Sequence, residues 1–188
     1  MNIIIIIFII ILIIIIYTEY NSMLVYNIAY ELGYSYIEKL KQQSFFNMKN
    51  PAVMFDIDDT LINQKGKPIK PIIKLLKKCL KESLIVLIIT ARDSYYYEDT
   101  VRQLKDLGIN YSFLYLRDSS HDDLYHFKSK IKETLSQYHD INTIMSIGDN
   151  IVDIEGEYSG YFIKLPNDRD SNLYHLNNKG VIETIKTI

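Results

Sequence analysis

The sequence predicts an α/β fold built on a doubly wound, parallel β-sheet. After residue 51, short apolar stretches alternate strictly with stretches of helical periodicity. One apolar stretch, residues 84–89, is uninterrupted, which is typical of a strand covered on both faces. Strands that alternate with helices form a parallel sheet joined by right-handed crossovers. In such a sheet, ligands bind beyond the carboxyl ends of the strands.

The expected elements follow from these patterns in chain order. Strands are expected at residues 52–55, 84–89, 111–116, 141–147 and 160–165. A helix should begin at Pro71, because proline suits the first helical position. A second should occupy residues 98–107 and end at Gly108. A third is expected at residues 123–137, with an apolar face formed by Leu124, Phe127, Ile131 and Leu135.

The chain begins with an apolar segment of a different kind. Residues 3–16 are fourteen consecutive Ile, Leu or Phe residues without a charge. As a helix they would measure about 21 Å, less than the ~30 Å of a bilayer core. No Lys or Arg precedes them and no A-x-A-like cleavage site follows. Residues 1–19 are therefore interpreted as a signal peptide or a membrane anchor, which predicts a membrane-anchored or secreted protein.

Two further segments complete the predicted organisation. Residues 20–50 should form an amphipathic helix and a linker, because Leu24, Ile28 and Leu32 recur at helical spacing. Residues 51–188 should form the α/β domain. The 188-residue chain has a formal net charge of −2, which gives no general attraction to nucleic acid. Its single cysteine excludes an internal disulfide, so packing alone must hold the fold.

Chemically distinctive side chains stand where the predicted strands end. They are Asp56, Asp58 and Thr60 after the first strand, Thr90 and Arg92 after the second, and Asp149, Asn150 and Asp153 after the fourth. The helix before the fourth strand adds Lys128, Lys130 and Lys132. Crowded carboxylates repel one another unless a cation compensates them. A hard divalent ion is the natural compensation, and Mg²⁺, which uses few carboxylates plus phosphate, fits best.

Other metal sites fit the residues less well. A calcium loop beginning at Asp56 would place Leu61 where glycine is needed and Lys67 where the bidentate glutamate is needed. The four histidines are scattered along the chain and show no zinc-site spacing. Magnesium therefore remains the expected cofactor.

The order Asp-x-Asp-x-Thr, Thr, Lys and Gly-Asp-x-x-x-Asp resembles the haloacid-dehalogenase (HAD) superfamily of phosphohydrolases. The resemblance covers residues 53–167. The stretches at 127–130, 147–153 and 164–167 are similar to the acid phosphatase branch, class B, subgroup IIIB. The resemblance implies a Rossmann-like HAD core that hydrolyses phosphomonoesters in the manner of an acid phosphatase or a 5′-nucleotidase.

The resemblance also implies roles for individual residues. Asp56 would attack phosphorus to form an aspartyl-phosphate, and Asp58 would act as general acid and base. Thr90 and Lys128 would hold the phosphoryl group, and Lys128 is preferred to Lys130 for its Phe-Lys-Ser context. Mg²⁺ would be bound by Asp56, Asp149 and the Asp58 carbonyl, with Asp153 positioning that shell. The candidate substrate-binding residues are Thr60, Arg92 and Asn150.

The spacing between these motifs bears on the substrate. Neither residues 60–90 nor residues 90–128 leave room for a separate cap domain, so the site should be open. An open site admits a phosphorylated small molecule, a nucleotide or a phosphoprotein. Residues 95–97, three tyrosines, either stack on a base or pack a loop.

Three alternative functions make different demands on the sequence. A polynucleotide 3′-phosphatase should show a basic stripe, which the near-neutral charge does not supply. A non-catalytic storage or structural protein on this fold should lack the nucleophile, whereas Asp56 is present. A receiver-type signalling domain would place the phosphorylated Asp after a central strand rather than after the first. Nucleic acid is therefore not an expected partner, and membrane contact is expected only through the N-terminal segment.

Overall fold

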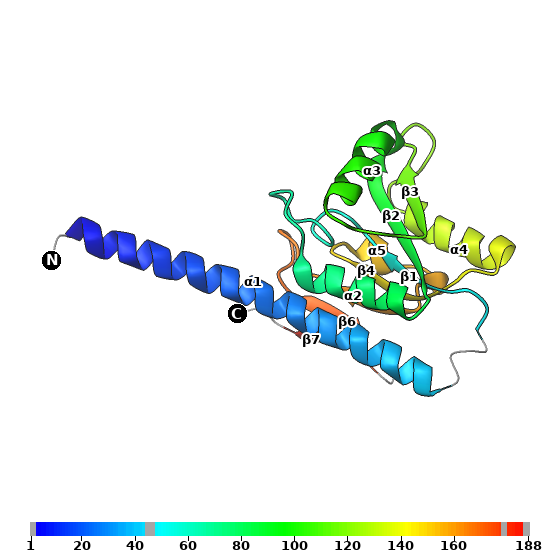
Figure 1. Ribbon diagram of the computed structural model, residues 1–188, viewed down its shortest axis with the longest axis horizontal. Helices are drawn as coiled ribbons and strands as arrows, with labels where there is room; N and C mark the ends of the chain where they lie inside the picture. Colours follow the sequence, from blue (N-terminus) through cyan, green and yellow to red (C-terminus); the bar gives the residue numbers. More distant parts are fainter. Residues whose placement is uncertain (1–2, 44–47, 178–179, 186–188) are drawn as a thin grey trace.

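The computed structural model describes residues 3–43, 48–177 and 180–185, without the side chains of residues 15–22. Its core is one seven-stranded sheet with the order β3-β2-β1-β4-β5-β6-β7 (Figure 1). The strands are β1 (Pro51–Phe55), β2 (Ile85–Asp93), β3 (Phe113–Arg117), β4 (Asn142–Gly148), β5 (Tyr161–Lys164), β6 (Leu173–Leu176) and β7 (Ile182–Ile185). The first five are parallel, which confirms the predicted sheet, and the last two are antiparallel.

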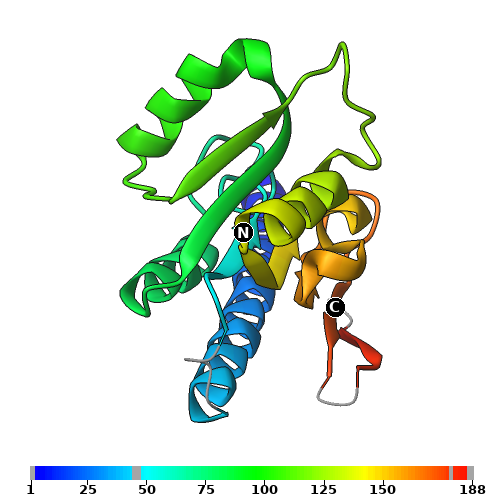
Figure 2. The same ribbon diagram turned by 90° about the vertical axis from the view of Figure 1, so that its right-hand side faces the viewer.

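Helices cover both faces of the sheet, so the sheet is doubly wound. Helices α2 (Lys70–Lys81) and α3 (Tyr97–Asp106) bury Leu75, Leu76 and Leu104 in one apolar cluster. Helix α4 (Phe127–His139) buries Phe127 and Leu135 in a second cluster, and the short α5 (Ile151–Ile154) packs beside it. Figure 2 shows α4 in yellow-green and α2 in green, well apart from each other. Residues 48–177 contain no additional folded module, as the spacing predicted.

Helix α4 begins four residues later than the sequence predicted. Residues 123–126 form a turn instead, in which the Asp123 carboxylate accepts a hydrogen bond from the backbone N–H of Tyr125 at 3.1 Å. This local bond competes with helix formation. The expectation that Leu124 faces the sheet is therefore wrong, and its side chain is 46% exposed.

The N-terminal part of the chain forms one long helix, α1 (Ile3–Gln42), rather than two separate segments. Its second half belongs to the core, where Val25, Ala29 and Ile37 are buried. Gly33 allows the close contact with α2, because a Cβ there would lie 2.5 Å from Leu75 Cδ2. The residues after Gly33 also reach β5, where the rings of Tyr36 and Tyr161 stack with centroids 4.3 Å apart.

Helix α1 runs antiparallel to the strands and leaves the domain at their carboxyl ends. Near its end, Lys41 pairs with Glu82 at 2.8 Å, just before β2 begins. Tyr26 lies toward the opposite edge, where burial and the Asp59 and Asp149 carboxylates raise the pKa of its phenol. Residues 3–14 project beyond this edge with every side chain exposed (Figure 1). None of the helices in the described part of the chain is both long and apolar enough to cross a bilayer.

Candidate active site

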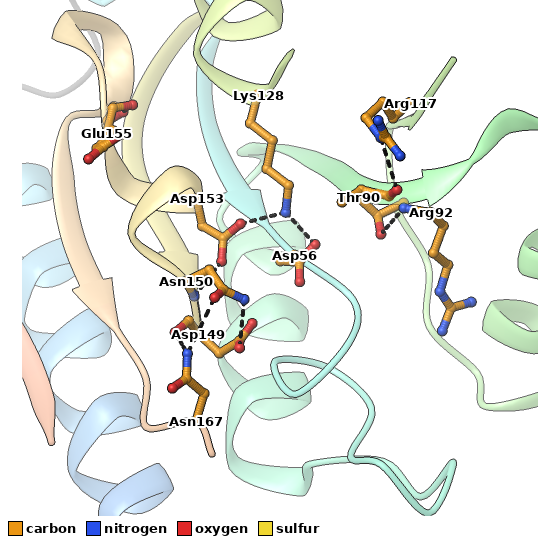
Figure 3. A network of polar contacts seen from close by, with 12 residues as sticks. Asp56, Thr90, Arg92, Arg117, Lys128, Asp149, Asn150, Asp153, Glu155 and Asn167 are labelled. Atoms are coloured by element: carbon orange, nitrogen blue, oxygen red, sulfur yellow. Dashed lines mark hydrogen bonds and ion pairs between the residues drawn. The ribbon is translucent and has the colours of Figure 1, made fainter. Parts of the chain in front are cut away.

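The residues predicted from the strand ends meet in one pocket at the carboxyl edge of the sheet. The pocket has a volume of about 490 Å³. Residues that directly follow β1 and β4 line it together with Thr90 and Ala91 of β2, and α4 and α5 contribute further side chains (Figure 3). Among its lining residues are Asp56, Asp58, Thr90, Lys128, Asp149 and Asp153. With Asn150, seven of the nine residues to which the sequence analysis gave a role line this one pocket.

Asp56 and Lys128 form a buried ion pair at the centre of this pocket. Lys128 Nζ donates to Asp56 Oδ1 at 2.6 Å and also to Asp153 Oδ1. Lys130 is exposed, so the side chain that reaches Asp56 is that of Lys128, as its sequence context suggested. Burial raises the pKa of the Asp56 carboxyl, and Asp153 and Asp149 raise it further, against the effect of the Lys128 ammonium. One lysine therefore does not compensate the acids around it.

Three buried carboxylates are placed to share a cation. Asp56, Asp149 and Asp153 each offer an oxygen, and these oxygens lie within 4.8 Å of one another. Burial and the neighbouring Asp153 raise the pKa of Asp149 to about 6. Three carboxylates and one ammonium sum to a charge of −2 at this point of the site. Hard oxygen donors with that charge fit a divalent cation of the magnesium or calcium class.

Asp153 differs from the other two acids because both of its oxygens are already engaged. One accepts from Lys128, and the other accepts the backbone N–H of Asn150 at 2.8 Å. The second bond is half of a capping box in which Asn150 caps the first turn of α5. Gly148 makes room for this arrangement, because a Cβ at that position would overlap the Asp153 carboxylate. The Gly-Asp-Asn-x-x-Asp stretch thus encodes a strand end, a cap and an anchored carboxylate.

Asp58 lies at the pocket mouth and is held by Arg92. The Arg92 Nε and Nη2 atoms donate to the two Asp58 oxygens at 2.8 and 2.7 Å. Arg92 also donates to Gln103 Oε1 at 2.7 Å. Its side chain lines a neighbouring cavity of about 700 Å³, together with Tyr96, rather than the pocket that holds Asp56. The structure thus places Arg92 behind Asp58, although the sequence suggested a substrate contact.

The two threonines of the sequence motifs occupy different environments. Thr90 lines the pocket, and its hydroxyl accepts the backbone N–H of Arg92 at 3.3 Å. Thr60 is fully buried, does not line the pocket, and its hydroxyl has no hydrogen-bond partner. It stands in a turn in which the Ile57 carbonyl accepts backbone N–H groups from three later residues. Thr60 is thus, with Arg92, one of the two predicted substrate-binding residues that do not line the pocket.

Sequence reasoning missed several residues around the pocket. Asn167 Nδ2 donates to the Asp149 carbonyl at 2.7 Å and so ties the loop after β5 to β4 (Figure 3). In the sequence, residues 164–167 show only a similarity to the acid phosphatase branch, which does not place Asn167 in the site. Large apolar side chains also reach the rim, at Leu124, Tyr125 and Ile151. The three tyrosines at 95–97 are exposed and do not line this pocket.

The sequence from residue 63 to residue 170 matches the family described as HAD superfamily, subfamily IIIB (Acid phosphatase). The match covers more than half of the 188 residues. The chain belongs to this family. Membership in the HAD subfamily IIIB confirms the resemblance drawn from the strand-end motifs. Because the matched region begins after Asp56 and Asp58, the roles of these two residues rest on their place at the end of β1.

Two solved acid phosphatase structures share the fold of this chain. The class C acid phosphatase from Bacillus anthracis and its form with tungstate bound each align with a TM-score of 0.57. Both alignments cover 72% of this chain and 65% of the other, at 18% and 20% sequence identity. At these identities the similarity concerns the fold alone, and this chain spans less than two thirds of those proteins. No curated protein sequence matches this chain.

Proposed function

We propose that this HAD-subfamily IIIB protein hydrolyses phosphomonoesters through an aspartyl-phosphate formed on Asp56, with Mg²⁺ as cofactor. The observation that carries the proposal is the buried Asp56 carboxylate, bonded to Lys128 and grouped with Asp149 and Asp153. A storage or structural protein has no need to bury this uncompensated charge. The near-neutral sequence gives no support to a polynucleotide 3′-phosphatase.

The proposed reaction has two displacements at phosphorus. An Asp56 oxygen forms a bond to phosphorus while the ester P–O bond breaks, and Asp58 gives its proton to the leaving oxygen. Asp58 then accepts a proton from water as the water oxygen attacks phosphorus, and the bond to Asp56 breaks to release phosphate. Arg92 donates to both Asp58 oxygens, so at least one of these bonds has to open before Asp58 carries the proton that it gives to the leaving oxygen.

Other residues stabilise the transferring group. The Lys128 ammonium and the Thr90 hydroxyl face the pocket that a phosphoryl group would enter, and both stabilise negative charge there. Bound Mg²⁺ would be held by the Asp56 and Asp149 carboxylates and the Asp58 carbonyl, and would supply Lewis-acid stabilisation of phosphoryl oxygens. Asp153, whose two oxygens accept hydrogen bonds from Lys128 and from the Asn150 backbone, would orient Lys128 and add its negative charge to the cation site.

The open rim indicates the class of substrate. Tyr125 is 67% exposed and Ile151 is 57% exposed, and both lie on the rim with Leu124. Exposed apolar side chains beside a phosphate pocket favour a leaving group with an apolar or aromatic surface. We therefore propose a phosphorylated small molecule or a nucleotide as substrate. A phosphoprotein is the other ligand that a pocket without a cap admits.

The proposed activity resides in residues 51–188, with residues 23–42 of α1 as a packed support. Residues 1–19 are proposed to act as a signal peptide or a membrane anchor, which would make the protein secreted or membrane-associated. The support for this is that the exposed side chains of residues 3–14 are apolar on every side of the helix. A helix of that kind is unfavourable in water.

The test compares Asp56→Asn with the wild-type chain on a chromogenic phosphomonoester, with Mg²⁺ and with a chelator. The substitution keeps the shape of the side chain but removes the nucleophilic oxygen, so turnover should be lost. Asp140→Asn is a matched control, because Asp140 is exposed at φ +55°, a conformation that asparagine also adopts. Substantial hydrolysis by folded Asp56→Asn protein would refute the mechanism, whereas full activity in chelator would refute only the metal requirement.

A further inference from the structure

Lys132 is a fully buried lysine that the proposed chemistry does not use. Its exposed fraction is 0%, and it does not line the pocket of Asp56. Lysine is rarely buried to this extent unless it is paired, because transfer of an ammonium from water into a protein is costly. Burial accordingly lowers the pKa of Lys132 to about 8, although Asp153 opposes this effect. A lysine whose burial costs this free energy is expected to have a specific role.

The Lys132 ammonium is fully hydrogen-bonded to the segment that follows the metal-binding acids. Its Nζ atom donates to the carbonyl oxygens of Asp153 and Glu155, each at 3.0 Å, and to the Ser159 hydroxyl. An ammonium has three donors, so all three are used. The two carbonyls belong to the end of α5, where a helix leaves such groups unsatisfied. Lys132 thereby joins α4 to the whole segment from α5 to Ser159.

The same face of α4 holds Asp153 at two points. Lys128 and Lys132 are four residues apart, a spacing that puts both side chains on one side of the helix. Lys128 donates to the Asp153 carboxylate, and Lys132 donates to the carbonyl of the same residue. The α5 segment that these bonds hold in place begins directly after Asp149 and Asn150. Displacement of α5 would therefore move Asp153 away from Lys128 and alter the setting of Asp149.

We propose that Lys132 is a positioning residue for the phosphatase site, which fixes α5 so that Asp153 orients Lys128 and Asp149 remains in place for the metal. This inference rests on the proposed function. It assigns Lys132 no contact with substrate or metal. Removal of a residue that hydrogen-bonds to the metal ligands, without contacting the metal itself, typically lowers metal affinity or activity ~10–100-fold. An effect of that size, selective for metal and turnover, separates positioning from a purely structural role.

The test uses Lys132→Met in the full chain, with Lys130→Met as a matched control on the exposed side of the same helix. Thermal unfolding first establishes the temperature range in which each variant is folded. Within that range, Lys132→Met should lower kcat and weaken Mg²⁺ binding in calorimetry by roughly tenfold or more, with KM little changed. Lys132→Gln keeps hydrogen-bond donors and should recover part of both losses. Lys130→Met should match the wild type.

Several outcomes would overturn the inference. A folded Lys132→Met chain with wild-type kcat and Mg²⁺ affinity would show that the lysine serves stability alone. If Lys132→Met does not fold, Ser159→Ala, which removes one acceptor, must show the same selective loss of Mg²⁺ affinity; an unchanged affinity would refute the proposal. The two proposals can fail separately. Inactive Asp56→Asn beside fully active Lys132→Met rejects the role of Lys132 alone, whereas active Asp56→Asn rejects the function.

Discussion

At the scale of single residues, Asp149 and Asp153 show how neighbouring carboxylates acquire different tasks. Asp153 has both oxygens bonded, to Lys128 and to the Asn150 backbone. Asp149 has one oxygen bonded to the Asn150 side chain at 2.8 Å. Burial and the nearby Asp153 raise the pKa of Asp149. No lysine or arginine of the described residues forms an ion pair with Asp149, whereas Lys128 pairs with Asp56 and Asp153. Asp149 is therefore expected to depend on a bound cation.

The residue-scale prediction is that Asp149→Asn abolishes the effect of Mg²⁺ on stability. Mg²⁺ that binds only the folded state should stabilise the wild type by RT ln(1 + [Mg²⁺]/Kd) and thereby raise its Tm. In chelator the variant should be at least as stable as the wild type, because it removes a carboxylate crowded by Asp153. Thermal unfolding with and without Mg²⁺ measures both effects. An undiminished rise of Tm in the variant would remove Asp149 from the metal site.

The sequence predicted the positions of these residues better than their contacts. Asp56, Thr90 and Asp149 follow predicted strands, and parallel strands bring their ends to one edge, so their proximity could be inferred. The partners of long side chains could not. Arg92 lies past the predicted end of the second strand but within β2, and its guanidinium turns to Asp58 and Gln103. Such choices depend on distances between elements, which no spacing in the sequence specifies.

At the scale of elements, the contact between α1 and α2 combines apolar packing with a cluster of charges. Lys78 forms ion pairs with Glu38 at 2.9 Å and with Glu82 at 2.8 Å, and Lys41 pairs with Glu82. Bonds from Lys41 and Lys78 lower the pKa of Glu82 from 4.5 to about 2. A carboxyl whose pKa is depressed by folding stabilises the fold above its unfolded pKa. That contribution is lost as pH falls through the folded pKa.

The element-scale prediction follows from the lowered pKa of Glu82. Glu82→Gln should lower Tm relative to the wild type at neutral pH, and the difference should shrink as pH falls from about 4.5 toward about 2. Added salt should also reduce this difference in Tm, because the side chains of Lys41, Lys78 and Glu82 are partly exposed. Parallel unfolding curves over this pH range provide the measurement. A difference that stays constant down to pH 2 would mean that the charges of Glu82 do not stabilise the contact.

Two elements escaped prediction for a common reason. Strands β6 and β7 have four residues each, and β7 is largely exposed, so neither forms an apolar run. Their antiparallel pairing depends on the sheet edge at β5, to which β6 is hydrogen-bonded. The residues of β6 and β7 alone do not indicate it. The start of α4 was misplaced because the apolar Leu124 fitted the helical period. The Asp123 carboxylate instead accepts the backbone N–H of Tyr125, and the chain forms a turn there.

At the scale of the whole molecule, the apolar end of α1 projects from the domain beyond the carboxyl edge of the sheet (Figure 1). The pocket of Asp56 lies at this same edge. Residues 3–14 expose Ile, Leu and Phe side chains that make no contribution to the apolar core. Burial of each such side chain is worth roughly 1.5–3 kcal/mol by area estimates. A lipid surface that received this segment would therefore lie on the side of the pocket.

The whole-molecule prediction is that the full chain floats with lipid vesicles, whereas a chain that begins at Met23 stays in solution. Both should hydrolyse a soluble ester at similar rates and unfold at similar temperatures, because residues 3–14 lie outside the core. Flotation in a density gradient is the measurement. A full-length chain that remains soluble and monomeric in the presence of vesicles would contradict the membrane proposal and leave the catalytic one intact.

The central claim is that Asp56 carries the phosphoryl group during turnover. The most direct measurement is peptide mapping by mass spectrometry after the chain has reacted with a phosphomonoester and been quenched rapidly in acid. We expect one phosphoryl group on Asp56 in the wild-type chain and none in Asp56→Asn. A phosphoryl group that forms at the rate of turnover on another side chain, such as one of the four histidines, would contradict the account.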